Sequence, residues 1–172
     1  RISEDGRRYD IDSEVLVRPT SELPSHLAIH RHLQSRGKTF SAVVHTHPTE
    51  LIALSHNSQF LTEGVLSKLL WSMIPETKIF VPRGIGIVPY LLTGTRELAH
   101  ATIESLKNHD VVLWEKHGVL AAGEDVEECF DLIDTLTKSA QIYLGAKTAG
   151  FEPEGLNDSQ LDELAAAFHN FN

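Results

Sequence analysis

The sequence predicts an α/β domain, because short apolar segments typical of strands alternate with longer segments whose apolar residues recur at helical spacing. The clearest strand segments are Phe40–Pro48, FSAVVHTHP, and Val111–Trp114, VVLW. The clearest helical segment is Asp125–Gly150, which keeps helical spacing for about five turns. With 172 residues and 41% hydrophobic residues, the chain is long enough for one domain with a real core. We therefore expect a single domain over residues 1–172.

Turn residues and apolar spacing place the other elements. In chain order we expect an extended segment over Tyr9–Val17, a helix over Pro19–Gly37, a short helix over Thr49–Asn57, a helix over Leu61–Trp71, a strand over Lys78–Val81, an extended element over Gly84–Leu92, a helix over Thr95–Asn108 and a final helix over Ser159–Phe168. Asp125 and Glu128, three residues apart, resemble a capping box at the start of the longest helix.

Charge and composition exclude several classes of function. The formal net charge is −9 and no run is rich in lysine or arginine, which argues against a nucleic-acid or anionic-membrane surface. No apolar run approaches the ~20 residues that a membrane helix needs. The single cysteine, Cys129, excludes an intramolecular disulfide and suits a reducing compartment. We expect a cytoplasmic protein, with Cys129 in the core.

Two histidines end the first strand segment. In a strand, alternate side chains share a face, so His45 and His47 point the same way, with ~6.5–7 Å of rise between them, close enough to reach one metal ion. Ala42, Val43 and Val44 are apolar without alternation, as in a strand covered on both sides. Histidines at strand ends often only hydrogen-bond backbone or water, so a metal site needs a third ligand.

His117 supplies that third imidazole. It follows the Val111–Trp114 strand and precedes Gly118, which permits close backbone approach or an unusual φ. Three imidazoles without a thiolate describe a catalytic zinc site, which keeps one coordination position open, although cobalt, manganese and iron remain alternatives. The chain contains no His-Glu-x-x-His helix motif of a zinc hydrolase and no Gly-x-Ser-x-Gly nucleophile elbow.

Two glutamates are candidate catalytic groups. Glu22 begins the helix that leads into the histidine strand, so the start of the helix and the end of the strand can lie on the same side of the sheet. The alternative is a carboxylate that only complements the helix dipole. We expect Glu76 in a loop, where the ordinary interpretation is a solvated charge. His26, His30 and His32 share no metal geometry and are expected at the surface or partly buried.

Several segments, in order and at matching spacing, resemble the class II aldolase/adducin family. They are PTSELPSH (Pro19–His26), VVHTHPTELIAL (Val43–Leu54), LLWSMIPET (Leu69–Thr77), GIGIVPY (Gly84–Tyr90), VVLWEKHGV (Val111–Val119) and FDLIDTLTKSAQIYL (Phe130–Leu144). The resemblance implies a three-layer α/β/α domain with a central, largely antiparallel sheet, assembled as a homotetramer. It also implies zinc-dependent retro-aldol cleavage of a sugar phosphate.

Within the family, the PTSE and WSMIPET segments favour members that cleave L-rhamnulose 1-phosphate to dihydroxyacetone phosphate and L-lactaldehyde in rhamnose catabolism. The resemblance carries the zinc ligands onto His45, His47 and His117, one zinc per subunit. It carries the acid/base carboxylate onto Glu22, and a second glutamate, contributed across a subunit interface, onto Glu76. The alternatives are another class II sugar-phosphate aldolase, a 4-epimerase, or a non-catalytic adducin-like binding module.

The chain departs from the family at its beginning. It starts at Arg1, and the family's Asn-Gly-Gly-Asn segment and its phosphate-binding loop, which precede the PTSE motif, are not in it. We therefore expect it to represent about the C-terminal two-thirds of the family domain. Thr20 is the remaining candidate for contact with a substrate phosphate.

Overall fold

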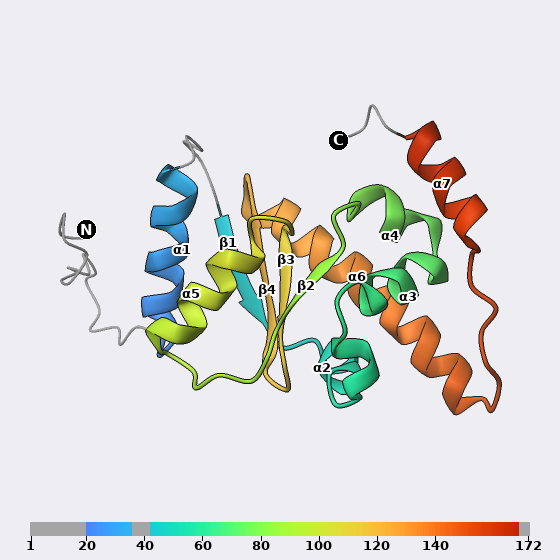
Figure 1. The fold of residues 1–172 in the computed structure, drawn as a ribbon, viewed down its shortest axis with the longest axis horizontal. Coiled ribbons are helices and arrows are strands. Elements are labelled where there is room, and N and C mark those ends of the chain that lie inside the picture. Colours follow the sequence, from blue (N-terminus) through green and yellow to red (C-terminus); the bar gives the residue numbers. More distant parts are fainter. Residues whose placement is uncertain (1–19, 36–41, 169–172) are drawn as a thin grey trace.

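A computed structural model describes residues 20–35 and 42–168. A mixed four-stranded sheet forms its centre (Figure 1). The strands lie in the order β1-β4-β3-β2, with bounds β1 Ala42–Thr46, β2 Ile85–Val88, β3 Val111–Trp114 and β4 Gly118–Gly123. The β1/β4 and β4/β3 pairs are antiparallel and the β2/β3 pair is parallel.

Helices cover both faces of this sheet and give the expected three-layer α/β/α architecture. One face carries α1 (Leu23–Ser35) and α5 (Arg96–Ser105) (Figure 1). The other carries α2 (Thr49–Leu54), α3 (Val65–Met73) and the long α6 (Val126–Thr148). A 3-10 helix, η1 (Ser58–Leu61), leads into α3, and α4 (Pro75–Phe80) and α7 (Asp158–Ala167) pack on the outer side of this layer.

Alternation along the strands divides the core into two clusters. In β3, Val111 and Leu113 pack towards α3 and α6, whereas Val112 and Trp114 pack towards α1 and α5. This is the period-2 pattern of a strand buried on both faces, and it is why VVLW is continuously apolar. Cys129 is fully buried in the α6 cluster, as predicted.

The expected strand over Lys78–Val81 is wrong, because its first three residues belong to α4 and Val81 is the C-cap of that helix. Pro75 occupies the first turn of α4 after an extended Ile74, which suits its fixed φ and missing amide hydrogen. The fully buried Thr77 hydroxyl then bonds to Ser139 of α6, 2.6 Å away. Tertiary packing thus overrides the weak β-propensity of four residues. Glu76 therefore lies in a helix rather than in a loop.

Two strands of the sheet, β4 and β1, also differ from expectation. The sequence did not predict β4, although its six residues are all buried. Ala42 and Val44 of β1 pack on one face of the sheet and Val43 on the other, as predicted, but all three are only half-buried. They are half-buried because β1 is an edge strand among the described residues.

The other expected helices are confirmed within a few residues at their ends. The Tyr9–Val17 segment and Gly37 lie outside the described residues. At the start of α6, Asp125 accepts a hydrogen bond from the Glu128 amide, but the Glu128 carboxylate bonds to the Glu124 amide rather than to that of Asp125. Only one of the two bonds of a capping box therefore forms at Asp125.

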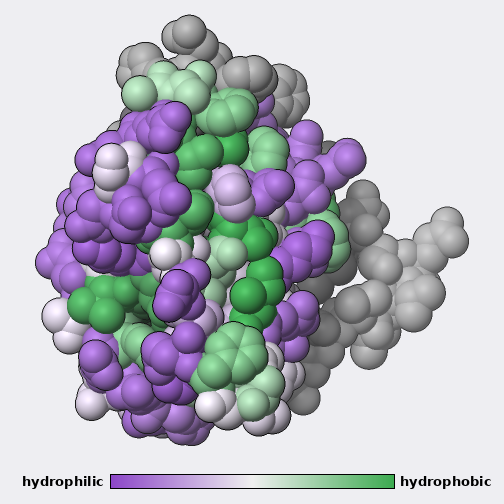
Figure 2. All heavy atoms as spheres, turned by 90° about the vertical axis from the view of Figure 1, so that its right-hand side faces the viewer, coloured by the Kyte–Doolittle hydropathy of each residue, from purple (hydrophilic) through white to green (hydrophobic). Residues whose placement is uncertain are grey.

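The surface on the α7 side carries hydrophobic side chains interspersed among hydrophilic ones (Figure 2). None of the helices in the described part of the chain has the length and apolar character needed to cross a membrane.

Candidate metal centre

The three predicted histidines come together at one end of the sheet. His45 and His47 lie at the end of β1, and His117 lies in the turn that joins β3 to β4. Thr46 pairs with Val119 in the β1/β4 ladder, so the end of β1 is placed beside the start of β4. One candidate ligand atom from each of the three imidazoles lies within 4.8 Å of the other two. The triad could therefore hold one metal ion.

Hydrogen bonding orients the His45 ring. Its Nδ1–H donates to the Val119 carbonyl oxygen over 3.0 Å, which leaves the lone pair on Nε2. Nε2 is buried and has no hydrogen-bond partner within residues 20–35 and 42–168. A buried acceptor without a partner is costly unless something fills its place, and histidine ligands commonly donate their other N–H to a carbonyl in this way. The donor set therefore fits a metal ion.

Burial also favours the neutral form of His45 and His117. The pKa of His45 is lowered to about 4, chiefly by burial, while the hydrogen bond to Val119 opposes this shift and the neighbouring His117 and His47 contribute to it. Burial lowers the pKa of His117 as well, while the Glu22 carboxylate opposes that shift. Because a metal binds only the neutral imidazole, these two ligands need not lose a proton to bind it at neutral pH.

Trp114 and Gly118 shape the space around the rings. The ring centroid of Trp114, which is 1% exposed, lies 4.5 Å from that of His45 and 5.2 Å from that of His117. The Trp114 indole N–H donates to the Thr102 hydroxyl over 2.9 Å, which fixes the indole. A Cβ on Gly118 would lie 2.8 Å from both the His45 and the His47 rings. Gly118 is therefore needed for the predicted close approach.

Glu22 lies on the same side of the sheet as the triad. Immediately before α1, it is only 6% exposed, and its charge acts on His117 and His26. Its Oε2 accepts a hydrogen bond from the Gly94 amide over 3.3 Å. The structure thus places a buried carboxylate near His117 of the triad, as the order of helix and strand suggested.

The other candidate residues lie outside the histidine triad. Thr20 is exposed, and its hydroxyl accepts a hydrogen bond from the Glu22 amide over 3.3 Å. Glu76 is exposed in the first turn of α4, which packs on α3, α6 and α7. In this helical layer α4 lies at the opposite end from α2, the helix that follows His47 (Figure 1). His26, His30 and His32 are partly buried on α1, as expected.

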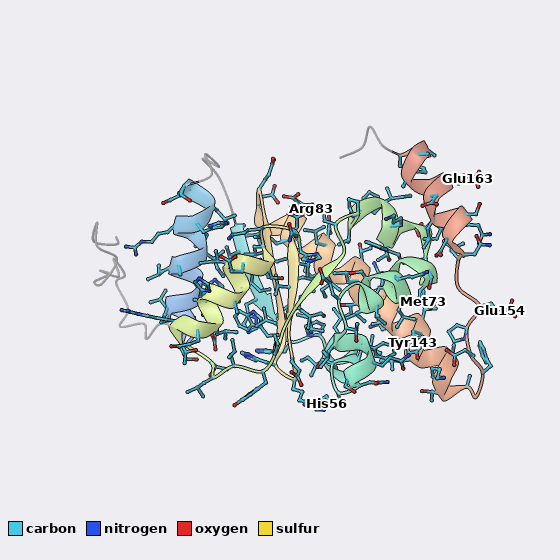
Figure 3. All side chains as sticks on the ribbon, viewed as in Figure 1. His56, Met73, Arg83, Tyr143, Glu154 and Glu163 are labelled. Carbon is cyan, nitrogen blue, oxygen red and sulfur yellow. The ribbon has the colours of Figure 1, made fainter. Side chains whose placement is uncertain are left out.

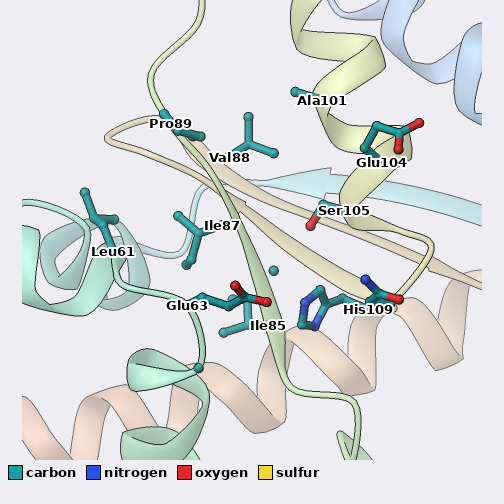
Figure 4. Close-up of a pocket in the computed structure, with 13 residues that line it drawn as sticks. Leu61, Glu63, Ile85, Ile87, Val88, Pro89, Ala101, Glu104, Ser105 and His109 are labelled. Atoms are coloured by element: carbon teal, nitrogen blue, oxygen red, sulfur yellow. The ribbon is translucent and has the colours of Figure 1, made fainter.

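A cavity of about 450 Å³ lies apart from the triad, along β2 (Figure 4). Its polar lining includes Glu63, Glu104, Ser105 and His109. A second, of about 520 Å³, lies along α6 with an acidic lining. Neither contains a triad histidine, and the candidate site is identified by its ligand geometry.

Sequence reasoning missed three residues that support the site, namely Gly94, Trp114 and Ser55. Gly94 is 72 residues from Glu22, and Ser55, whose hydroxyl accepts from the Lys116 amide, is 61 residues from Lys116. No local pattern marks such pairs, because the contacts exist only once distant segments have packed together.

Comparison with known proteins agrees with this geometry. Residues 3–144 match the family model for the class II aldolase and adducin N-terminal domain. The chain is 53% identical over 169 residues to a rhamnulose-1-phosphate aldolase from Bacteroides thetaiotaomicron, covering 98% of this chain and 63% of that protein. It is 36% identical over 172 residues to a rhamnulose-1-phosphate aldolase from Enterococcus faecalis, covering 98% of this chain and 61% of that protein.

A solved structure extends the likeness to the fold. The sugar-phosphate aldolase from Thermotoga maritima superposes with a TM-score of 0.70 at 40% identity, covering 79% of this chain and 57% of that one. The chain spans about three-fifths of the length of the curated relatives it matches. The matched motifs, the three-layer fold and the convergent histidines lead to one conclusion: the chain belongs to the class II aldolase and adducin family.

Proposed function

We propose that the complete protein is a zinc-dependent aldolase that cleaves L-rhamnulose 1-phosphate into dihydroxyacetone phosphate and L-lactaldehyde. The observation that carries this proposal is the convergence of His45, His47 and His117, with ligand atoms within 4.8 Å of one another, beside the buried carboxylate of Glu22. The relatives named rhamnulose-1-phosphate aldolase support the choice of substrate.

The triad would hold the metal through three neutral imidazoles and leave a coordination position for the substrate. We assign zinc because imidazole ligands suit it. When bound, the metal supplies Lewis-acid stabilisation of the negative charge that develops on the substrate, which contributes several kcal/mol.

Glu22 is assigned to proton transfer at C3 of the sugar. In cleavage, a base takes the proton of the C4 hydroxyl, and its oxygen becomes the aldehyde oxygen of L-lactaldehyde. The C3–C4 bond breaks, and its electron pair, left on C3, takes a proton from Glu22. In the aldol direction Glu22 removes that proton. The bond from the Gly94 amide to Oε2 orients the carboxylate for this step.

Two further residues belong to the proposal through the family resemblance. The Thr20 hydroxyl, exposed next to Glu22, is assigned to the substrate phosphate. Glu76, exposed on α4, is assigned to the aldehyde end of a neighbouring subunit's site, in a homotetramer. A site shared between subunits would explain why Glu76 is not near the triad of its own chain.

The test is metal content together with coupled detection of dihydroxyacetone phosphate, on the intact protein and on a His47→Ala variant. We expect about one zinc per chain in the intact protein, and loss of both zinc and cleavage in the variant. Zinc without cleavage of L-rhamnulose 1-phosphate would refute the substrate and favour a related aldolase or epimerase. No metal and no turnover would refute the enzyme and favour a binding module.

A further inference from the structure

Ser55 connects two parts of the candidate metal centre without touching either. It lies at the end of α2 and is fully buried. Its hydroxyl donates to the Ile52 carbonyl oxygen over 2.6 Å and accepts a hydrogen bond from the Lys116 amide over 2.8 Å. The first bond lies within its own helix, and the second reaches the turn that carries His117.

That turn has an unusual backbone conformation. Lys116 has φ 58, and among the described residues it is the only non-glycine with positive φ. The His117 amide donates to the Trp114 carbonyl oxygen over 3.0 Å, which closes the turn with Lys116 at its third position. A positive φ there favours glycine or asparagine, because other side chains are strained. An external contact is needed to hold a lysine in it, and the Ser55 hydroxyl supplies one.

The other end of this connection is also fixed. α2 begins two residues after His47, and its Leu51 and Leu54 side chains are buried in the core. The Glu50 carboxylate accepts a hydrogen bond from the side-chain amide Nε2 of Gln141, on α6, over 3.0 Å. α2 is therefore a rigid link between His47 at its beginning and Ser55 at its end. His56, the next residue, lies at the opposite end of the sheet from Arg83 (Figure 3).

We propose that Ser55 is a positioning residue of the metal centre, which holds the turn over residues 115–117 so that the His117 imidazole converges with His45 and His47. This inference rests on the proposed function, because it concerns the same metal. Ser55 itself contacts neither metal nor substrate. It fixes the third ligand relative to the helix that follows the first two.

The chain offers a matched control in Ser67. It is a buried helical serine, 4% exposed, whose hydroxyl donates to the Ile85 carbonyl oxygen over 3.3 Å and accepts from the Ile85 amide over 3.0 Å. Ser67→Ala therefore removes a comparable pair of bonds at a place that carries no candidate ligand. Any general loss of stability should affect both variants alike.

The experiment compares intact protein, Ser55→Ala and Ser67→Ala. Zinc affinity is measured by competition with a chelating indicator, and exchange of the Lys116 amide hydrogen is measured in the metal-free proteins. For Ser55→Ala we expect zinc affinity to fall by about 10–100-fold, the usual cost of losing an outer-shell contact, and the Lys116 amide to exchange faster. For Ser67→Ala we expect both to match the intact protein.

A double variant tests the physical cause. Glycine adopts a positive φ without strain, so Ser55→Ala/Lys116→Gly should regain much of the lost zinc affinity. If Ser55→Ala alone folds poorly, the double variant provides a second protein without the Ser55 hydroxyl in which zinc affinity can be measured.

Equal zinc affinity in Ser55→Ala and the intact protein would overturn the inference while leaving the proposed function standing. Failure of the double variant to bind more tightly than Ser55→Ala would overturn the backbone mechanism. Conversely, zinc binding without cleavage in the intact protein would refute the proposed function and leave the Ser55 result valid.

Discussion

At the scale of single residues, the candidate chemistry depends on side chains held by backbone groups. The Val119 carbonyl oxygen orients His45, and the Gly94 amide orients Glu22. The contact at His45 leaves its other ring nitrogen, Nε2, without a hydrogen-bond partner among the described residues. This arrangement predicts separate effects for ligand and proton-transfer residues.

Glu22→Gln should separate the metal from the chemistry. The amide keeps the size of the side chain but cannot transfer the proton, so we expect kcat to fall by about 10²–10⁴-fold with zinc content unchanged. Steady-state kinetics and metal analysis on the same samples measure both. Glu97→Gln, at an exposed glutamate in the first turn of α5, is the control and should leave kcat unaltered. Wild-type turnover in Glu22→Gln would remove Glu22 from the mechanism.

Gly118→Ala should weaken metal binding through the shape of the site. Its Cβ would lie 2.7 Å from the Thr46 carbonyl oxygen and 2.8 Å from the His45 ring, so the ligands must move. We expect about tenfold weaker zinc binding or more, measured by chelator competition. Gly145→Ala, on α6, is the matched control, because the added Cβ would meet nothing within 4 Å. This control should stabilise the helix by about 0.5–1 kcal/mol. Unchanged zinc affinity in Gly118→Ala would contradict the close approach.

At the scale of elements, caps and turns account for where the helices begin. Thr95, Asp125 and Asn157 each accept a hydrogen bond from the amide three residues later, at the starts of α5, α6 and α7. The Asp125 cap could be predicted from the sequence, because capping is a local interaction between neighbouring residues. α4 could not, because its short segment follows the packing of Thr77 on Ser139 rather than its own propensity.

Asp125→Ala should destabilise α6 without changing the metal centre. The Asp125 carboxylate accepts the Glu128 amide over 2.8 Å, and loss of such a cap costs about 0.5–2 kcal/mol in the free energy of unfolding. Urea denaturation measures the loss, and zinc content should remain that of the intact protein. Asp125→Asn, which can still cap, should restore most of the stability. Equal stability of Asp125→Ala and intact protein would show that the helix does not depend on this cap.

At the scale of the whole molecule, the triad joins distant parts of the chain, so metal binding should stabilise the fold. His45 and His117 come from β1 and from the turn between β3 and β4, which the unfolded chain does not hold together. A ligand that binds only the folded state at 100 times its Kd adds about 2.7 kcal/mol. We therefore expect a chelator to lower Tm of the intact protein and zinc to restore it. His47→Ala should show little response to either, and an equal response in that variant would place the stabilising metal elsewhere.

The sequence by itself determined the α/β class, most helices, the Asp125 cap of α6, three of the four strands and the identity of the candidate ligands. These depend on local spacing, on turn residues and on motifs whose chemistry is visible in the residue types. Tertiary structure alone decided that Lys78–Phe80 is helical, that β4 joins β1 to β3, and that Gly94, Trp114 and Ser55 support the site. The physical reason is that each of these depends on packing or hydrogen bonding between segments distant in sequence, and no local pattern specifies which segments will meet.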